Sequence, residues 1–238
     1  MLGLLENIQE YNNAGALLGI DGMDDELLGA LKRANPVQRQ RLVNKITSTG
    51  SASRGSRGEM EKHFAELPQH IKSGLSKGEL RLADSVIYSI KPVTSKTIKM
   101  FETQDDKETG LRNISNAKLP KNQSILVSGI ILLVGVSASN AKDKVISTKF
   151  EHIEMHPAIA NGEFSLKCNK KQIVPETPNV IFKTDNYNRV PVGYYKLANP
   201  RLIHDDMLIE MVIELGTMEG IAENTYIYAG LHGTITTP

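Results

Sequence analysis

The sequence has a single cysteine, Cys168, and no tryptophan. One cysteine excludes a disulfide framework within the chain and any zinc site built from several cysteines. Cys168 follows alternating apolar residues in the run EFSLKC. We therefore expect it to be a small apolar side chain in a strand rather than a reactive thiol.

An excess of charge of one sign is also missing. Lys and Arg number 28 against 27 Asp and Glu, a formal net charge of +1, so the chain as a whole is neither a polycation nor a polyanion. The most apolar run, ILVSGIILLVGV at 125–136, is shorter than the ~20 residues that a membrane helix needs, and it predicts a buried strand. The first residues lack the basic and apolar regions of a signal peptide, so we expect a protein that is soluble when made.

Motifs of the common enzyme classes are absent from the sequence as well. It contains no G-x-S-x-G, no glycine-rich phosphate loop and no G-x-G-x-x-G. The acid pairs Asp105–Asp106 and Asp205–Asp206 are expected in loops, the second in the turn before a strand. We predict that the protein is not an enzyme and uses no cofactor.

What is present falls into two parts with different periodicity. Residues 1–80 follow a helical pattern and predict a helical N-terminal region. The segment DDELLGALKRA at 24–34 opens with acids and closes with basic residues, which suits the two ends of a helix. Residues 58–80 predict two short helices that are broken near Pro68, with Gly78 as the stop.

Residues 81–238 predict a separate, mainly β domain. In MLIEMVIEL at 207–215 the apolar residues recur at every second position, as in a half-buried strand. Similar runs are EFSLKC, DSVIYSI, KTIKMF, KVISTKF, NVIF, VGYYKL and TYIYAGLHGTIT. About eight short strands with no long helix between them favour an antiparallel jelly-roll sandwich.

The segment FEHIEMH at 150–156 raises the question of a metal site. On a strand, His152, Glu154 and His156 share one face, but the two histidines stand about 13 Å apart, too far to meet at one ion. On a helix they converge, yet the zincin pattern needs Glu directly after the first His, where Ile153 stands. We predict no metal here, and His152 and Glu154 are the residues with which to test that prediction.

The cupins, jelly-roll proteins that bind metal, provide the leading alternative. A cupin carries two histidines separated by one residue, then a glutamate, and later a histidine after Pro-x-Gly. In this sequence Glu154 stands where the second histidine belongs, and Lys196 of PVGYYK stands where the last one belongs. Because two ligand positions differ, a cupin-like metal-dependent enzyme is the less favoured interpretation.

A ligand- or glycan-binding jelly-roll module is a second alternative. Sugar-binding modules present exposed aromatic platforms, often of Trp, which this chain lacks. Candidate platforms are Tyr187, Tyr194, Tyr195, Tyr226 and Tyr228. Tyrosine in strands more often packs at a sheet surface, so this interpretation is also less favoured.

Seven basic residues lie between Glu26 and Glu59 with no acid among them, and we call them the basic arm. They are Lys32, Arg33, Arg39, Arg41, Lys45, Arg54 and Arg57. Part of the arm lies on Thr47–Glu59, whose Gly and Ser content is typical of a flexible linker. Such an arm can neutralise the phosphates of nucleic acid or of lipid headgroups, although a solvated helix face is the alternative. No aromatic residue interleaves, so stacking on single-stranded bases is not expected.

The C-terminal third carries a resemblance to a known family. VGYYKLANPRLIHDDMLIEMVIEL at 192–215 and NTYIYAGLHGTITTP at 224–238 resemble the closing strands of jelly-roll capsid proteins from tailless icosahedral bacteriophages. The segment at 106–133 is similar to the same proteins, particularly those of phages with an internal membrane. The shared features are a Gly-aromatic strand, an NPRLI corner, an alternating acidic strand and a terminal LHGT, and they cover residues 80–238.

The resemblance implies a virion structural protein that is made in the host cytoplasm and located in the virion. Its partners would be copies of itself, in an icosahedral assembly, and other virion proteins. The N-terminal arm would contact neighbouring subunits and either the genome or the internal membrane. Main-shell, vertex and accessory roles all stay open.

Overall fold

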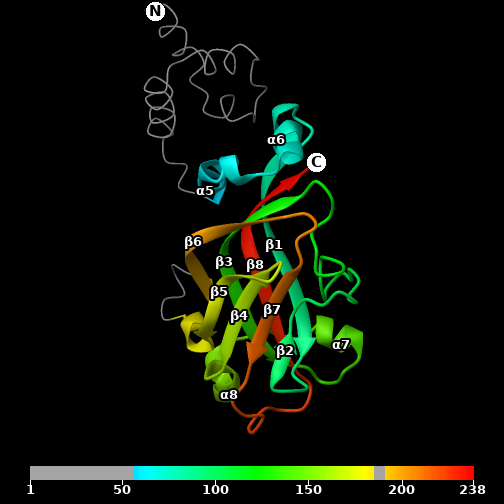
Figure 1. Cartoon of the computed structure of the whole chain (residues 1–238). Coiled ribbons are helices and arrows are strands. Elements are labelled where there is room, and N and C mark those ends of the chain that lie inside the picture. The colour runs from blue at the N-terminus through cyan, green and yellow to red at the C-terminus, as the bar shows by residue number, and fades with distance from the viewer. Residues whose placement is uncertain (1–55, 185–190) are drawn as a thin grey trace, which may run out of the picture.

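The computed structural model describes residues 56–184 and 191–238, and within them the chain is mainly β (Figure 1). Two four-stranded antiparallel sheets face each other as a sandwich. The strands are β1 (Arg81–Pro92), β2 (Thr97–Lys99), β3 (Ser124–Val136), β4 (Glu163–Cys168), β5 (Lys171–Pro178), β6 (Tyr194–His204), β7 (Ile209–Glu214) and β8 (Thr225–Thr237). The helices are α5 (Ser56–Lys62), α6 (Gln69–Ser76), α7 (Lys142–Ile146) and α8 (Pro157–Ala160), with the single 3₁₀ turns η2 (Phe64–Glu66), η3 (Ile153–Met155) and η4 (Asn179–Phe182).

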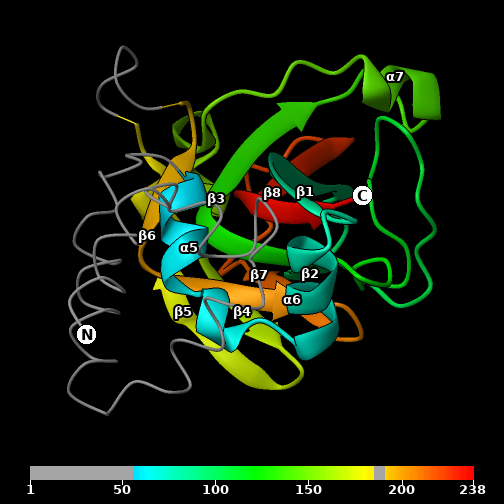
Figure 2. The ribbon, with the colours of Figure 1, turned by 90° about the horizontal axis from the view of Figure 1, so that it is seen from above.

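One sheet has the strand order β1-β8-β3-β6 and the other β2-β7-β4-β5. Strands far apart in the sequence are therefore neighbours, and the register of β1 on β8 pairs Arg81 with Thr237. Seen from above, α5 and α6 lie across the upper end of the sandwich (Figure 2).

The core lies between the two sheets, and the period-two runs supply it. Ile209, Met211 and Ile213 of β7 are fully buried, as are Ile227 and Leu231 of β8. Each such side chain stabilises the fold by ~1.5–3 kcal/mol on burial. The expected alternation of these two strands is confirmed.

β3 is the strand expected from the long apolar run, and it lies inside its sheet between β8 and β6. Its register on both neighbours shifts between Val127 and Gly129. Gly129 leaves room there for the ring of Tyr194, which would have to move if this position carried a Cβ atom.

The helices α5 and α6 lie on either side of Pro68, where residues 58–80 predict two short helices. Gly78 follows α6 with a φ of +73°, the left-handed conformation that a terminating glycine adopts. A small apolar cluster joins these helices to the sheet through Met60, Leu67, Ile71, Leu75, Leu80 and Leu126. The helical pattern of residues 1–55 lies outside the described residues.

Two predicted strands are wrong. KVISTKF at 144–150 forms the end of α7 and a turn, because Val145 reaches the apolar cluster around Tyr226 from a helical turn. NVIF forms η4, because Asn179 follows Pro178 and is tied down by its own bonds, which run from its backbone N–H to Gly162 O and from its Nδ2 to Ile159 O.

One strand, β5, was not predicted. It contains Pro175 and ends at Pro178, and it pairs only with β4 among the described strands. Proline removes a backbone donor and is confined to sheet edges, which is where β5 lies.

The division of the chain into domains at residues 80 and 81 stays a prediction, although β1 begins at Arg81. Across the described ranges, no helix has both the length and the apolar character to cross a membrane.

Candidate functional site

The segment FEHIEMH is neither the strand nor the regular helix between which the sequence left a choice. It contains the 3₁₀ turn η3, with His152 before it and His156 after it. Within the turn Ile153 is buried at 1% exposure, whereas Met155 is 67% exposed. Backbone curvature therefore directs successive side chains of this segment to different surroundings.

The charged groups of this segment engage separate partners. Glu154 forms an ion pair with Lys183 at 3.0 Å, and Glu151 forms one with Lys149 at 2.7 Å. The Lys149 hydrogen bond and charge hold the pKa of Glu151 below its usual range. Burial lowers the pKa of His156, an effect that the charge of Glu151 partly offsets.

Within 56–184 and 191–238, no three His, Cys, Asp or Glu side chains are grouped so that they could hold a metal ion. Lys196, at the second position of the cupin comparison, approaches Glu59 of α5 at 3.9 Å. His152 and Glu154 stay the residues with which a metal site would be tested.

The basic arm cannot be placed from the described residues. Lys32, Arg33, Arg39, Arg41, Lys45 and Arg54 lie outside them, and Arg57 lies in the first turn of α5 with its side chain undescribed. Phosphate binding by the arm stays a prediction.

Two tyrosines considered as glycan platforms pack against other parts of the protein. Tyr226 is 8% exposed, and Tyr228 stacks on Tyr88 with ring centroids 5.5 Å apart. Tyr187 lies outside the described residues.

Cys168 is buried in β4 as expected, and burial together with the charge of Glu210 raises the pKa of its thiol to about 11.

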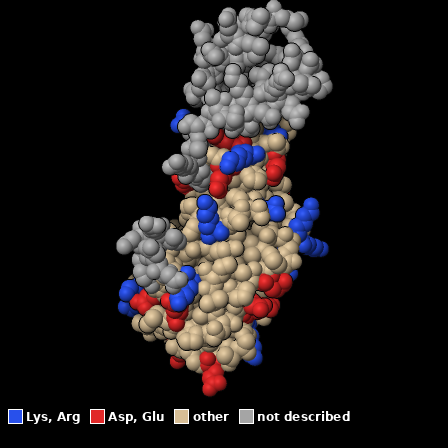
Figure 3. Space-filling view, turned by 90° about the vertical axis from the view of Figure 1, so that its left-hand side faces the viewer, with Lys and Arg blue, Asp and Glu red and all other residues tan. Residues whose placement is uncertain are grey.

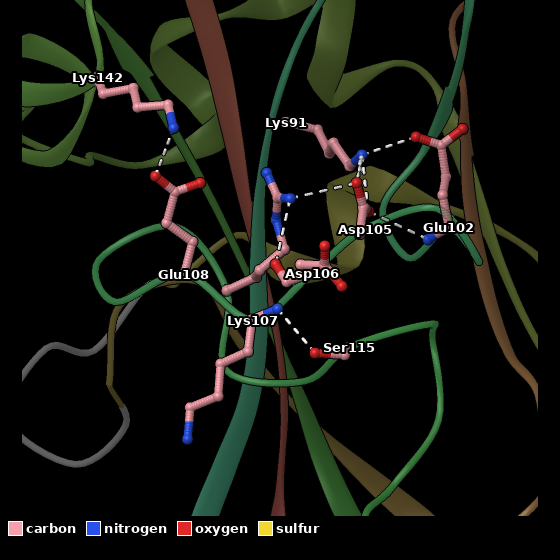
Figure 4. Close-up of polar contacts among 9 residues, drawn as sticks. Lys91, Glu102, Asp105, Asp106, Lys107, Glu108, Ser115 and Lys142 are labelled. Atoms are coloured by element: carbon pink, nitrogen blue, oxygen red, sulfur yellow. Dashed lines mark hydrogen bonds and ion pairs between the residues drawn. The ribbon is translucent and has the colours of Figure 1, made fainter.

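Among the described residues, the densest group of charged contacts lies beside β1, on the loop that follows β2 (Figure 4). The Lys91 ammonium contacts Glu102 at 2.6 Å and Asp105 at 2.8 Å, and the Arg112 guanidinium contacts Asp105 at 3.3 Å. The side chains of Lys91, Asp105 and Arg112 are between 12% and 19% exposed. Two cations balance two anions, so this group, the charged cluster, fastens the loop without leaving a net charge.

Sequence reasoning placed Asp105 in a loop but missed the charged cluster. Lys91 and Arg112 come from different places along the chain, and no motif links them. Farther along the loop, Lys142 of α7 contacts Glu108 at 2.7 Å, and the Lys107 N–H donates to Ser115 Oγ at 2.8 Å (Figure 4). A cluster of this kind can hold the backbone of the loop in position. Both of its cations are already paired with carboxylates.

The loop that the charged cluster holds covers the outer edge of β1. Ile90 N–H donates to Leu111 O at 2.8 Å, and Tyr88 N–H donates to Asn113 Oδ1 at 2.8 Å. Asn113 Nδ2 in turn donates to Val86 O at 2.7 Å. An exposed strand edge is a template for pairing with other chains, and these bonds occupy it.

A buried carboxylate joins α6 to the sandwich at the opposite end of the molecule from η3. Asp205, in the expected turn before β7, is 7% exposed and accepts from the Asn122 N–H at 2.8 Å. The same carboxylate faces His70 Nε2 of α6 at 3.3 Å. This contact positions the helical layer over the end of the sheets.

On the side where β6 lies in Figure 1, charged side chains gather around a broad area that bears none (Figure 3). Two strongly exposed apolar side chains, Met155 at 67% and Val180 at 54%, stand on η3 and η4, which contact each other. Exposed apolar side chains on two adjoining turns suit contact with another protein.

A comparison with protein-family models and with curated proteins finds no match for this chain.

Proposed function

We propose that this chain is a virion structural protein, a capsid building block that packs against copies of itself through a jelly-roll domain. Its N-terminal arm contacts neighbouring subunits and genome or membrane. No chemistry is required of it. Function lies in the shape of the subunit and in the surfaces it presents.

The strand pairing carries this proposal. The partners are β1 with β8, β2 with β7, β3 with β6 and β4 with β5. A long antiparallel ribbon pairs its first strand with its last in this way, and winding it into two sheets produces the jelly roll of capsid proteins, lectins and cupins. The pairs β3 with β8 and β4 with β7 close the two sheets in the order that winding requires.

The structure of the sheet edges at β1 and β5 also supports the proposed role as a capsid building block. The loop around Asn113 covers the β1 edge, and in β5 Pro175 has no backbone N–H to donate. Since these two of the four edges discourage strand addition, copies in this proposal pack through faces and loops, where closed rings can form. The uncharged area of Figure 3 is one such face.

The test is the mass of the purified full chain in solution, measured by light scattering, with electron microscopy and metal analysis of the same sample. Trimers, pentamers or shell-like particles without stoichiometric metal are the expected result. A monomer at all concentrations tested, with no particles, would overturn the proposal.

The same sample separates the two alternatives. A monomer with stoichiometric zinc or iron that is lost in His152→Ala would favour the cupin-like enzyme. A metal-free monomer that binds glycans would favour the ligand-binding module.

A further inference from the structure

The one Asn–Gly pair of the sequence, Asn161–Gly162, joins α8 to β4 (Figure 1). In such a pair the backbone nitrogen of the glycine can attack the side-chain amide carbon of the asparagine. A five-membered succinimide ring forms, ammonia leaves, and water then opens the ring to aspartate or to isoaspartate. The reaction needs no enzyme and no cofactor, and it makes asparagine a thermolabile residue. Glycine favours it, because a residue without a side chain hinders the attacking nitrogen least.

The packing of this part of the sandwich requires the glycine but not the asparagine. A Cβ atom on Gly162 would lie 2.5 Å from Glu214 O and 3.0 Å from Asn179 Nδ2, so only glycine fits there. Asn161 follows the last residue of α8 with a φ of −84°, a value that most residues adopt. Its side chain is exposed, so water reaches the amide.

The folded backbone holds the pair in a geometry that does not react. The ψ of Asn161 is 2°, so Gly162 N is eclipsed with the backbone nitrogen of Asn161 and is turned away from its Cβ. Attack on the side-chain amide therefore needs a rotation about the Cα–C bond of Asn161. That rotation would break the hydrogen bond that Gly162 N–H donates to Ile159 O at 3.1 Å.

Further contacts fix Gly162 from its other side. Its carbonyl oxygen accepts from Asn179 N–H at 2.8 Å, and Asn179 Nδ2 donates to Ile159 O at 2.9 Å. Asn179 and Ile159 are fully buried, and Glu163 is already paired with a strand on each side. We call residues 157–163 together with Asn179 the α8 corner. Asn161 can reach the reactive geometry only when the α8 corner opens.

We propose that Asn161 is a deamidation site that the α8 corner protects in the folded protein and that opening of this corner exposes. Isoaspartate carries the main chain through its side-chain carbon, so the backbone gains one methylene group directly before β4. The α8 corner has no space for it, because Gly162 already approaches Glu214 O so closely that a Cβ atom does not fit. A chain that stays open long enough to form isoaspartate does not close again, so the modification is a permanent mark of past opening.

A second Asn–Gly pair in the same full chain provides the matched control. Glu219→Asn creates it before Gly220, at an exposed position with open space around the glycine. The two pairs lie on different tryptic peptides, 150–167 and 202–238, so mass spectrometry follows both in one sample. In the folded chain at mildly alkaline pH, Asn161 should deamidate about tenfold or more slowly than position 219, because only the open state reacts. In guanidinium chloride the two rates should be similar.

Two results would overturn the proposal. Equal rates at positions 161 and 219 in the folded chain would mean that the α8 corner gives no protection. A rate at Asn161 that is as slow in guanidinium chloride as in buffer would mean that the local sequence, and not the fold, limits the reaction. The second comparison uses the wild-type chain and so does not depend on the folding of Glu219→Asn.

Refolding tests whether the mark is permanent. After incubation in guanidinium chloride and dilution, molecules with isoaspartate at position 161 should stay sensitive to protease. Asn161→Gln, treated in the same way, should refold, because glutamine would have to form a larger ring and reacts slowly. Molecules with isoaspartate that regain the protease resistance and the urea midpoint of the untreated chain would overturn this part of the proposal.

Discussion

The side chain of Asn113 bonds to β1 as a further strand would, donating from Nδ2 to the carbonyl oxygen of Val86 at 2.7 Å. Its Oδ1 accepts from Tyr88 N–H at 2.8 Å, so one amide replaces both backbone groups of a missing partner. β1 is the outermost strand of its sheet, and a loop side chain closes its free edge.

Asn113→Ala should therefore lower the free energy of unfolding by about 1–3 kcal/mol, since two backbone groups lose their partners. It should also increase self-association on mild heating, because the β1 edge becomes available. Urea denaturation and light scattering measure the two effects. Gln104→Ala, at an exposed position of the same loop, is the control and should change neither.

Lys91→Met should be more damaging than the loss of a surface ion pair. It leaves the carboxylates of Glu102 and Asp105 facing each other without their ammonium group, at a cost of about 3 kcal/mol. Lys142→Met removes a pair whose lysine is 71% exposed, and should cost less than about 1 kcal/mol. Equal destabilisation of the two variants in urea would contradict the importance assigned to the charged cluster.

Four glycine-to-alanine variants separate backbone strain from lack of space. Gly216 has ordinary φ and open surroundings, so its variant should lie within about 0.5 kcal/mol of wild type. Gly220 has a φ of +79° in open space, and its variant should cost about 1 kcal/mol. Gly233 has ordinary φ, but a Cβ there would collide with Leu126 O.

Gly193 combines both obstacles, a φ of +66° and a collision with Leu132 O. Its variant should be the least stable of the series in thermal unfolding, because neither relaxation of φ nor a shift of a side chain relieves it. If Gly193→Ala were as stable as Gly220→Ala, the backbone of β3 at Leu132 would be able to move away from the added Cβ atom at little cost in free energy.

His156 should make stability depend on pH below neutrality. Burial lowers its pKa in the folded state, whereas the unfolded chain has the usual value of about 6.5. The unfolded state then binds more protons, so this contribution is complete above about pH 7 and is lost as pH falls below 6.5 through the folded pKa. Urea midpoints between pH 8 and pH 5 should fall less steeply in His156→Gln. Parallel curves for the two proteins would contradict this.

Replacing Arg39, Arg41, Arg54 and Arg57 with Glu should impair particle assembly or genome retention while the sandwich stays folded by circular dichroism. The reason is reversal of charge where phosphates are expected to bind. The matched control replaces four exposed lysines of the sandwich with Glu: Lys99, Lys118, Lys121 and Lys171. Wild-type particle yield from the arginine variant would remove the basic arm from the proposed function.

Local patterns predicted those strands whose two faces differ. In β7, Ile209, Met211 and Ile213 alternate with residues outside the core, so periodicity alone identifies the strand. KVISTKF has similar local preferences, but the packing of Val145 determines its helical turn. β5 has Pro175 where a strand should not, and it is stabilised by pairing with β4.

Sites composed of distant residues could not be predicted in the same way. Lys91 and Asp105 meet because the loop folds back on β1, which depends on tertiary structure. In FEHIEMH the opposite holds, since His152 and His156 are close in sequence and a 3₁₀ turn separates their surroundings. Proximity along the chain was a poor guide to proximity in space in both cases.

The position of β8 inside its sheet sets a condition on biosynthesis. β1 has no other strand partner among those described, and β3 has β8 on one of its two sides. A nascent chain that has not yet made residues 225–237 therefore carries one strand without a ladder and another half-paired. The sandwich closes only when β8 inserts between β1 and β3. A translation product that stops before β8 is therefore an incompletely folded chain rather than a smaller subunit. Its unpaired strand edges are exposed to chaperones and proteases.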